Sequence, residues 1–488
     1  MKIKSFAELG SLLTGHHSLK QLLFKNTFWV SVSLGVGQLL RAALFIYMAR
    51  ILQATHYGIF SFVLAFVSLF TAFFDLGLSS IITREFSQNK EREKDFYSLV
   101  SLKFFVGLVT ILAIVISSFF ITPSFQIRKA IWIMAFFSFL TQFFEVFYAF
   151  LRARQRMEYE AWANIFQTLL LVSLVFFVLF RSPSVINISQ AYLLSGLIAL
   201  GIFTFFFHRK ILPFKLSFGL EVWSKFLKMS WPLALTSIFT MLYSYTDSII
   251  MGYLSQMAQA GWYNASLRIV KVAWVPGGII CISFYPVLTQ FADKARIDFQ
   301  RIWDYFLGVM FILALPIVFG GMALAERIII TLYGQGFDPS ILTFRILIVM
   351  QGVGFVSVAF SNLLVAVNQQ KKIFWTTVSG AVMNIILNLI LIPRFSLYGA
   401  AVASLISYLV VLIFYFWFSF RFVGIVCLSP KVSLIATASI FSSIAMFFAV
   451  ITPFVYKLNV LFSISIGACI YGMVFLSLAL IWNGLRKQ

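Results

Sequence analysis

The sequence predicts an all-α integral membrane protein of about fourteen transmembrane helices. Apolar residues fill 61% of the 488 positions and charged residues 11%, whereas soluble domains have about 45–50% and about 25%. Apolar runs of roughly 20 residues, enough to cross a bilayer as a helix, recur from Thr27 to Trp482. Only short polar segments interrupt them. Lipid is therefore the main solvent of this chain.

Apolar runs between charged residues define the predicted spans in order. The first six lie at 27–49, 56–80, 98–121, 130–151, 160–180 and 189–207. The next eight lie at 229–252, 262–290, 302–325, 339–367, 372–392, 397–418, 432–452 and 458–481. Residues 1–26 are polar and amphipathic, and since the first apolar run has full length we expect no cleaved signal peptide.

A connector at 208–228 divides the chain near its middle. It alternates bulky apolar and basic residues, which is typical of an amphipathic segment on the cytoplasmic membrane surface. We therefore predict one lobe at 27–207 with spans 1–6 and a second at 229–418 with spans 7–12. Residues 419–488 then provide spans 13–14 and a cytoplasmic C-terminus.

A weak internal repeat supports two pseudo-symmetric six-helix lobes. One offset sets Arg41 over Asp247, Gln53 over Gln259 and Tyr57 over Tyr263. The two hairpins aligned in this way stand at the start of each lobe, and membrane transporters are often built from two such repeats.

Lys and Arg are distributed unevenly between the loops. Most lie in alternate segments that include 84–94, 152–156 and 371–372, so the positive-inside rule places these segments and both termini in the cytoplasm. The loops of the other side hold Arg50, Arg128, Lys129, Arg181, Arg327, Arg394 and Lys457. The net charge of +21 is thus interpreted as attraction to anionic membrane lipids and not to nucleic acid.

Some basic residues fall within the spans, where a charge costs roughly 2.5–3.5 kcal/mol on insertion scales. Arg41 is expected either to line a cavity or to form a structural ion pair. Arg268 and Lys271 share one face of their helix and either line the cavity or extend to the outer interface. Arg345 has the same two alternatives, and Lys103 is expected to extend to the cytoplasmic edge.

Acidic and amide side chains in the spans give further candidates. Asp75 is expected to cap or kink its helix, and Glu145 is a candidate for ion coupling. Asp247 is placed at the depth of Arg268, which predicts an ion pair shared with Lys271; without that pair, Asp247 becomes a candidate for cation coupling. Asn384 and Asn388 are expected to hold helices together.

No catalytic constellation is present in the sequence. The histidines, His16, His17, His56 and His208, lie near predicted membrane surfaces, and no phosphate-binding loop or metal-ligand spacing occurs. Neither an enzyme nor a cofactor is therefore expected.

Several stretches are similar to a known family. ARILQATHYGIFSFVLAFVSLFTAFFDLGLSSIITREFS at 49–87 resembles the opening signature of bacterial polysaccharide and O-antigen flippases of the Wzx type. Their seventh and eighth spans resemble SWPLALTSIFTMLYSYTDSIIMGYL and AGWYNASLRIV, at 230–254 and 260–270. LYGQGFDPS at 332–340 and NIILNLILIPRFSLYGAAVASLISYL at 384–409 resemble later segments. The family's usual Leu-Gly after span 1 is Leu52-Gln53 here.

The resemblance implies a member of the multidrug/oligosaccharidyl-lipid/polysaccharide exporter superfamily, with V-shaped lobes around a central cavity in the bacterial inner membrane. Such a protein moves an undecaprenyl-diphosphate-linked oligosaccharide outward by alternating access, for O-antigen, lipopolysaccharide or related surface polymers. H⁺ or Na⁺ would be the coupling ion, and a polysaccharide polymerase and a chain-length regulator are the implied protein partners. Arg41, Arg268, Lys271 and Arg345 would then meet the diphosphate.

Two alternatives remain. A cation-coupled multidrug exporter of the same superfamily would present acids to cationic drugs, which the excess of basic residues disfavours. A membrane glycosyltransferase or polysaccharide polymerase would need a large outer loop, and no predicted outer loop is long enough.

Overall fold

A computed structural model describes residues 19–89, 94–210, 217–292, 296–423 and 428–485. Within these ranges every regular element is a helix. Parts of the predicted segments 1–26, 208–228 and 419–488 lie outside the described residues. The prediction of an all-α fold is confirmed.

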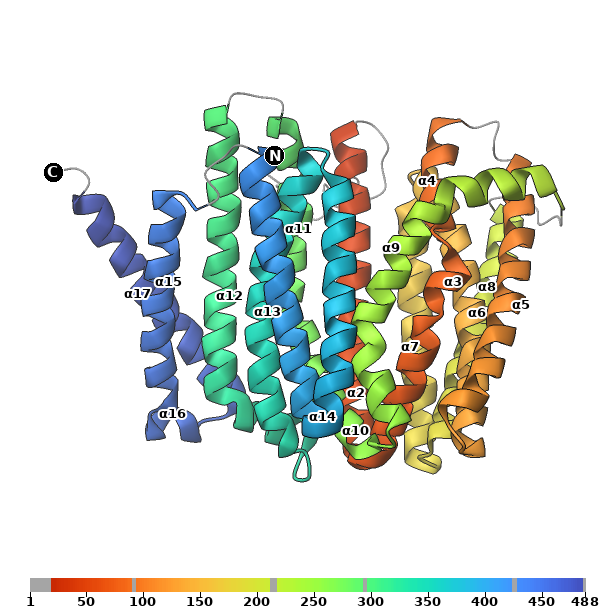
Figure 1. Cartoon of the computed structure of the whole chain (residues 1–488), viewed down its shortest axis with the longest axis horizontal. Helices are drawn as coiled ribbons and strands as arrows, with labels where there is room; N and C mark the ends of the chain where they lie inside the picture. Colours follow the sequence, from red (N-terminus) through yellow and green to blue (C-terminus); the bar gives the residue numbers. More distant parts are fainter. Residues whose placement is uncertain (1–18, 90–93, 211–216, 293–295, 424–427, 486–488) are drawn as a thin grey trace. The chain divides into compact units, whose positions relative to one another are not determined.

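The helices follow one another with short connections (Figure 1). They are α2 (Leu19–Leu69), α3 (Thr71–Asp75), α4 (Leu78–Gln88), α5 (Phe96–Ile121), α6 (Phe125–Ala153), α7 (Met157–Arg181), α8 (Val185–Lys210) and α9 (Leu220–Tyr253). After these come α10 (Met257–Ala273), α11 (Val275–Ala292), α12 (Arg296–Tyr333), α13 (Pro339–Ala366), α14 (Gln370–Val423), α15 (Pro430–Ile451), α16 (Pro453–Lys457) and α17 (Val460–Leu485).

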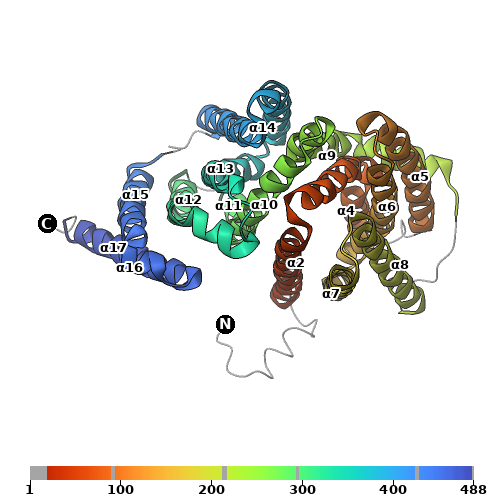
Figure 2. The ribbon, with the colours of Figure 1, turned by 90° about the horizontal axis from the view of Figure 1, so that it is seen from below.

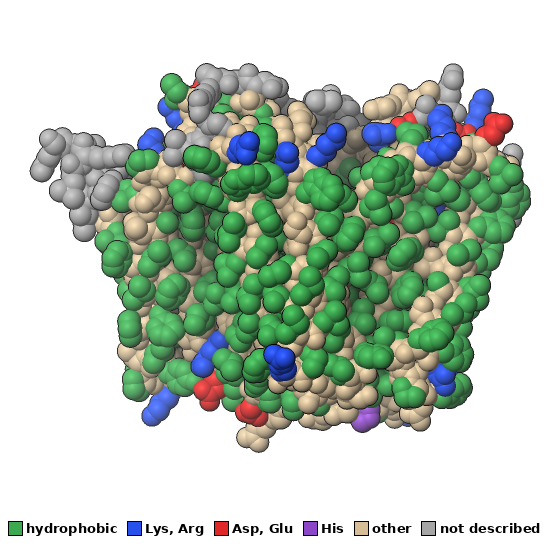
Figure 3. All heavy atoms as spheres, viewed as in Figure 1, with side chains coloured by type: hydrophobic (Ala, Val, Ile, Leu, Met, Phe, Trp, Pro, Cys, Tyr) green, Lys and Arg blue, Asp and Glu red, His purple; other side chains and the backbone are tan. Residues whose placement is uncertain are grey.

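Among the described residues, 11 helical stretches are long and apolar enough to cross a membrane. Two of them, Phe28–Gln88 and Gln370–Val423, contain a residue with left-handed backbone, Gln53 and Ser396 respectively, and therefore hold two predicted spans each. Figure 1 shows α14 as two rods joined at one end. The predicted span 229–252 lies within α9. The chain is a multi-pass membrane protein, and Figure 3 shows apolar side chains over the broad middle band of the face in view, with Lys and Arg gathered along its upper rim.

The chain divides into two compact units. Unit 1 comprises Met1–Leu52 and Ile59–Tyr245, and unit 2 comprises Gln53–Gly58 and Thr246–Gln488. The boundary therefore falls inside α9, and the turn of α2 belongs to unit 2. The second half of the predicted connector 208–228 is the beginning of α9, which continues without interruption into the predicted seventh span.

Unit 1 has an aromatic core where α4, α5, α6, α8 and α9 meet. Phe86, Phe96, Phe150 and Phe207 are all buried there. The rings of Phe96 and Phe150 are 4.9 Å apart, and those of Phe147 and Phe207 are 4.6 Å apart. Aromatic pairs at such spacings stabilise a core by more than the burial of their apolar surface alone. Many phenylalanines of this unit therefore stabilise contacts between helices.

Unit 2 is centred on α12, α13 and α14, whose core includes Trp303 packed 5.0 Å from Phe360. Viewed along the helices, α15 and α17 lie together beside α12 (Figure 2). The hydroxyl of Tyr471 on α17 donates to the carbonyl of Ile312 on α12 at 3.0 Å. The last two spans are thus packed on the helices of this unit.

Two turns of unit 2 touch backbone to backbone. A Cβ on Gly58 would overlap the carbonyl of Met257, and one on Gly261 would overlap the carbonyl of Ala54. The contact is reciprocal, as expected of two related hairpins. However, the reciprocal contact equates Gly58 with Gly261, and the turn residues with left-handed backbone are Gln53 and Ser255, so the predicted alignment of Gln53 with Gln259 is out of step by three or four residues.

Replacing Gly261 by alanine should therefore lower the free energy of unfolding by about 1–3 kcal/mol, the usual cost of overpacking. The contacted atoms are backbone and cannot rotate away. The thermal midpoint of the purified protein in detergent would report the loss. Gly201→Ala is the matched control because nothing lies within 4 Å of its Cβ position; it should be neutral or stabilising, as alanine is the better helix former. Equal midpoints for the two variants would contradict the close contact.

Candidate functional site

The predicted second span is broken inside unit 1. Leu76 and Gly77 have φ angles of 50° and 71°, between the end of α3 and the start of α4. A Cβ on Gly77 would lie 2.7 Å from the Cβ of Leu233 and 3.0 Å from the carbonyl oxygen of Ser230 on α9. The close approach of α9 leaves no room for a side chain at this position, and glycine also adopts the left-handed backbone without strain. The break falls beside Asp75, where the sequence predicted a cap or kink within the span 56–80.

Asp75 ends α3 at this break and forms an ion pair in which the lysine is buried and the carboxylate is partly exposed. Its carboxylate lies 2.6 Å from Nζ of Lys103 on α5, and the hydroxyl of Ser79 donates to the same oxygen at 2.5 Å. The Lys103 side chain is only 2% exposed. The expectation that Lys103 extends to the membrane edge was therefore wrong, because its charge is neutralised within the unit.

Glu145 on α6 belongs to a second charged group. Arg152 lies 3.6 Å from the Glu145 carboxylate and also forms a two-pronged contact with Glu160 of α7. Glu160 is nearly buried, whereas the Glu145 side chain is 41% exposed. Arg152 is thus shared between two acids, and Glu145 is the more accessible of them.

Arg41 lies half-exposed on α2 of unit 1. Its guanidinium donates to the hydroxyl of Thr168 on α7 at 3.3 Å. A Cβ on Gly37 would lie 2.8 Å from Arg41 Nη2, so the guanidinium lies close to the α2 backbone one turn away. Thr168 is a neutral partner, and this contact therefore leaves the positive charge of Arg41 uncompensated.

Asp247 stands in a buried polar network of unit 2. The hydroxyl of Tyr263 on α10 donates to one carboxylate oxygen, and the backbone N–H of Ser248 donates to the other at 2.6 Å. Tyr263 also lies 3.4 Å from the Ser404 hydroxyl of α14, and Asn264 donates to Ser248 at 3.0 Å. Three helices therefore meet around one carboxylate that is 4% exposed.

Tyr263 was not expected as the partner of Asp247, because the predicted depths of Asp247 and Arg268 were counted from a turn near Met257. The turn is centred on Ser255, which has left-handed backbone. Asp247 lies eight residues before Ser255 and Tyr263 eight residues after it, so these two side chains share a depth. Counting outward from the small and polar residues at 255–256, instead of from Met257, would have paired Asp247 with Tyr263.

The remaining predicted cations lie on α10 and α13. Arg268 is half-exposed, Lys271 is exposed, and Arg345 is exposed near the start of α13. The ion pair of Asp247 with Arg268 stays a prediction. Asn388 donates to Asn384 at 2.9 Å within α14. In the described part of the chain no group of three or more His, Cys, Asp or Glu could hold a metal ion.

The family model described as polysaccharide biosynthesis protein matches residues 23–292. A Haloferax volcanii protein named probable low-salt glycan biosynthesis flippase Agl15 is 26% identical, over 36% of this chain and 37% of its own length. The chain thus spans about a third of that relative. The uncharacterized membrane protein MJ1068 of Methanocaldococcus jannaschii is 25% identical over 88% of this chain and 90% of its own.

Solved structures resemble the whole chain. The lipid II flippase MurJ in an inward closed conformation aligns with a TM-score of 0.72 and 16% identity, covering 94% of this chain and 99% of that one. An inward-facing multidrug resistance MATE family transporter of the MOP superfamily aligns with a TM-score of 0.64 and 15% identity, covering 83% and 96%. At these identities the likeness establishes the fold, which is that of membrane transporters.

Proposed function

The chain belongs to the polysaccharide biosynthesis protein family, and from this we propose that it is a flippase for a lipid-linked oligosaccharide. The cargo would be an undecaprenyl-diphosphate-linked repeat unit, moved from the cytoplasmic to the outer leaflet by alternating access. The family match and the transporter fold support this proposal.

The environment of Arg41 is the main observation that supports an anionic, diphosphate-linked cargo. A diphosphate group in the membrane interior needs cations to offset its desolvation. Within the described part of the chain Arg41 donates to a hydroxyl and forms no ion pair with a carboxylate, so its charge is proposed to be available to an anion. Arg268, Lys271 and Arg345 are proposed to meet the same group, and their half-exposed or exposed side chains are compatible with that role.

Charge neutralisation tests the proposal. Arg41→Gln or Arg345→Gln should lower surface polysaccharide by about tenfold, which corresponds to about 1.4 kcal/mol of lost interaction, with unchanged protein in the membrane. Thr168→Val is the matched control for Arg41, because it removes the hydroxyl that positions the guanidinium and keeps the charge. Normal polymer in both arginine variants would contradict the cargo class. An effect of Thr168→Val as large as that of Arg41→Gln would instead assign Arg41 to structure.

Ion coupling is proposed at acidic residues. Asp247 and Glu145 are the candidates, with H⁺ or Na⁺ as the ion. Asp247 is supported by its burial among hydroxyl groups, and Glu145 by its accessibility beside Arg152. The proposed setting is the cytoplasmic membrane, with both termini inside and a polysaccharide polymerase as partner. The basic segments that the positive-inside rule assigns to the cytoplasm support this orientation.

A further inference from the structure

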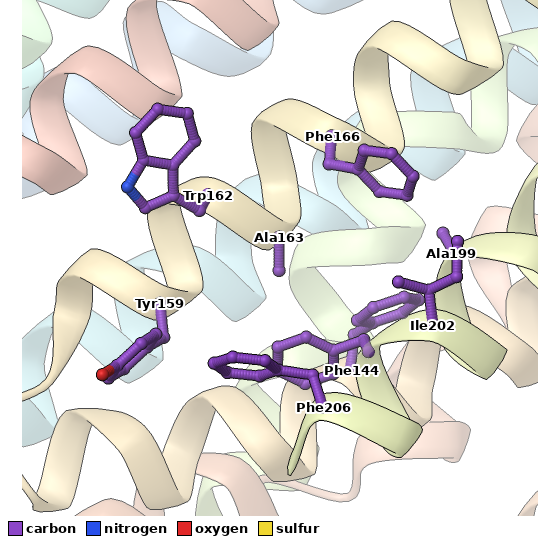
Figure 4. Close-up of a pocket in the computed structure, with 9 residues that line it drawn as sticks. Phe144, Tyr159, Trp162, Ala163, Phe166, Ala199, Ile202 and Phe206 are labelled. Carbon is purple, nitrogen blue, oxygen red and sulfur yellow. The ribbon is translucent and has the colours of Figure 1, made fainter. Parts of the chain in front are cut away.

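An apolar groove of about 350 Å³ opens on unit 1 between α6, α7 and α8. Its buried floor is formed by Phe144, Ala199 and Phe203. Its rims are exposed: Trp162 on α7 is 59% exposed and Ile202 on α8 is 52% exposed. Figure 4 shows Trp162 and Ala163 across an open space from Ile202 and Phe206. The volume is within the range of ligand sites, roughly 300–1,000 Å³.

The chemistry of the groove fits a hydrocarbon chain. The hydroxyl of Tyr159 and the indole N–H of Trp162 are the polar side-chain groups among the residues that line it. All three helices are predicted membrane spans, so the exposed rims face a hydrocarbon solvent. A groove with such walls offers no path for sugar or diphosphate, and its occupant is therefore expected to stay in place and not to cross the bilayer.

One end of the groove is basic. The rings of Tyr159 and Phe206 approach to 5.5 Å at this end. Lys210 lies one turn beyond Phe206, with Nζ 5.7 Å from its ring centroid, and Arg156 is exposed at the start of α7, one turn before Tyr159.

The nearby acids do not neutralise these cations. Glu158 is paired with Lys25 at 3.1 Å, and Glu160 is bound by Arg152. An apolar channel that ends at an excess of basic side chains matches a lipid with an anionic headgroup, since basic pockets at helix ends bind such headgroups.

We propose that this groove is a site for one anionic phospholipid, with an acyl chain between α7 and α8 and the phosphate beside Arg156 and Lys210. The lipid would fill the groove above its buried floor of Phe144, Ala199 and Phe203. This site is independent of the proposed transport of oligosaccharide. A zwitterionic lipid has no net negative charge to pair with Arg156 and Lys210.

Native mass spectrometry of the full chain in detergent, titrated with phosphatidylglycerol or phosphatidylcholine, tests the site. We expect one phosphatidylglycerol to bind at least about tenfold more tightly than phosphatidylcholine. Ala163→Phe should fill the groove and abolish that preference, whereas Val109→Phe, at a position on α5 that is 68% exposed, should leave it unchanged. Equal affinities for the two lipids, or full binding to Ala163→Phe, would overturn the proposal.

A charge variant keeps the test independent of packing. The double variant Arg156→Gln with Lys210→Gln should weaken the binding of phosphatidylglycerol by about tenfold and leave the binding of phosphatidylcholine unchanged. The matched control is Arg181→Gln with Arg421→Gln, because each of these exposed arginines stacks on an aromatic ring four residues earlier at another helix end. Equal losses in both pairs would show non-specific attraction. Displacement of phosphatidylglycerol by equimolar undecaprenyl phosphate would show that the groove binds the cargo lipid. Equal losses in both pairs, or this displacement, would refute a specific phospholipid site.

Discussion

Replacing Lys103 by methionine is expected to lower the free energy of unfolding by about 3 kcal/mol, the lower end of the usual effect of breaking a buried ion pair, because the Asp75 carboxylate is partly exposed. The variant leaves the Asp75 carboxylate without its cation at the break between α3 and α4. The methionine fills most of the volume of the lysine, so the effect comes from charge and not from a cavity. The thermal midpoint of the purified protein and its yield in the membrane should both fall.

The double variant Asp75→Asn with Lys103→Met should recover most of that loss, because neither charge then remains. Arg84→Gln serves as the control, since Arg84 is exposed and its pair with Glu85 should contribute less than about 1 kcal/mol. If the double variant is as unstable as Lys103→Met alone, the pair is not what holds the break together.

Tyr263→Phe is expected to reduce surface polysaccharide by at least tenfold and to lower the free energy of unfolding by about 1–3 kcal/mol. The variant removes the hydroxyl that donates to Asp247 and leaves a buried carboxylate oxygen without that donor. Polymer on whole cells, normalised to protein in the membrane, separates the loss of transport from the loss of folded protein.

Tyr333→Phe is the matched control in the same unit. Its hydroxyl is also buried and donates to the backbone carbonyl of Ala265 at 2.9 Å, so the variant loses a comparable hydrogen bond without touching Asp247. The two variants should lower the free energy of unfolding by similar amounts, but only Tyr263→Phe should reduce transport. Equal polymer levels in the two variants would remove Asp247 from the transport cycle.

Much of the fold could be predicted because a bilayer imposes a simple rule on sequence. Each span must be apolar over about 20 residues, so the order of spans is visible in composition. A cap or kink at Asp75 was expected from the sequence, but the helix that packs against the break was not. The break at Leu76–Gly77 depends on α9 approaching Gly77 from elsewhere in the chain, and no local pattern shows which helix packs against a glycine.

The polar residues were predictable as candidates but not as partners. Asp247 and Lys103 stand out because charges are costly in a span. Their partners depend on helix rotation and on the position of each turn. A turn placed two residues too late shifts the expected neighbour of Asp247 from Tyr263 to Arg268, and the side chain of Lys103 reaches an acid in place of the membrane edge.

The boundary between the two units lies within α9, between Tyr245 and Thr246, and not in a loop. A loop would absorb a rotation of one unit against the other at little cost, whereas a continuous helix must twist or bend. Asp247 is two residues from this boundary, and its hydrogen bonds tie that point of the helix to α10. A change in the charge of this carboxylate would therefore change the torsional stiffness of α9 beside the boundary.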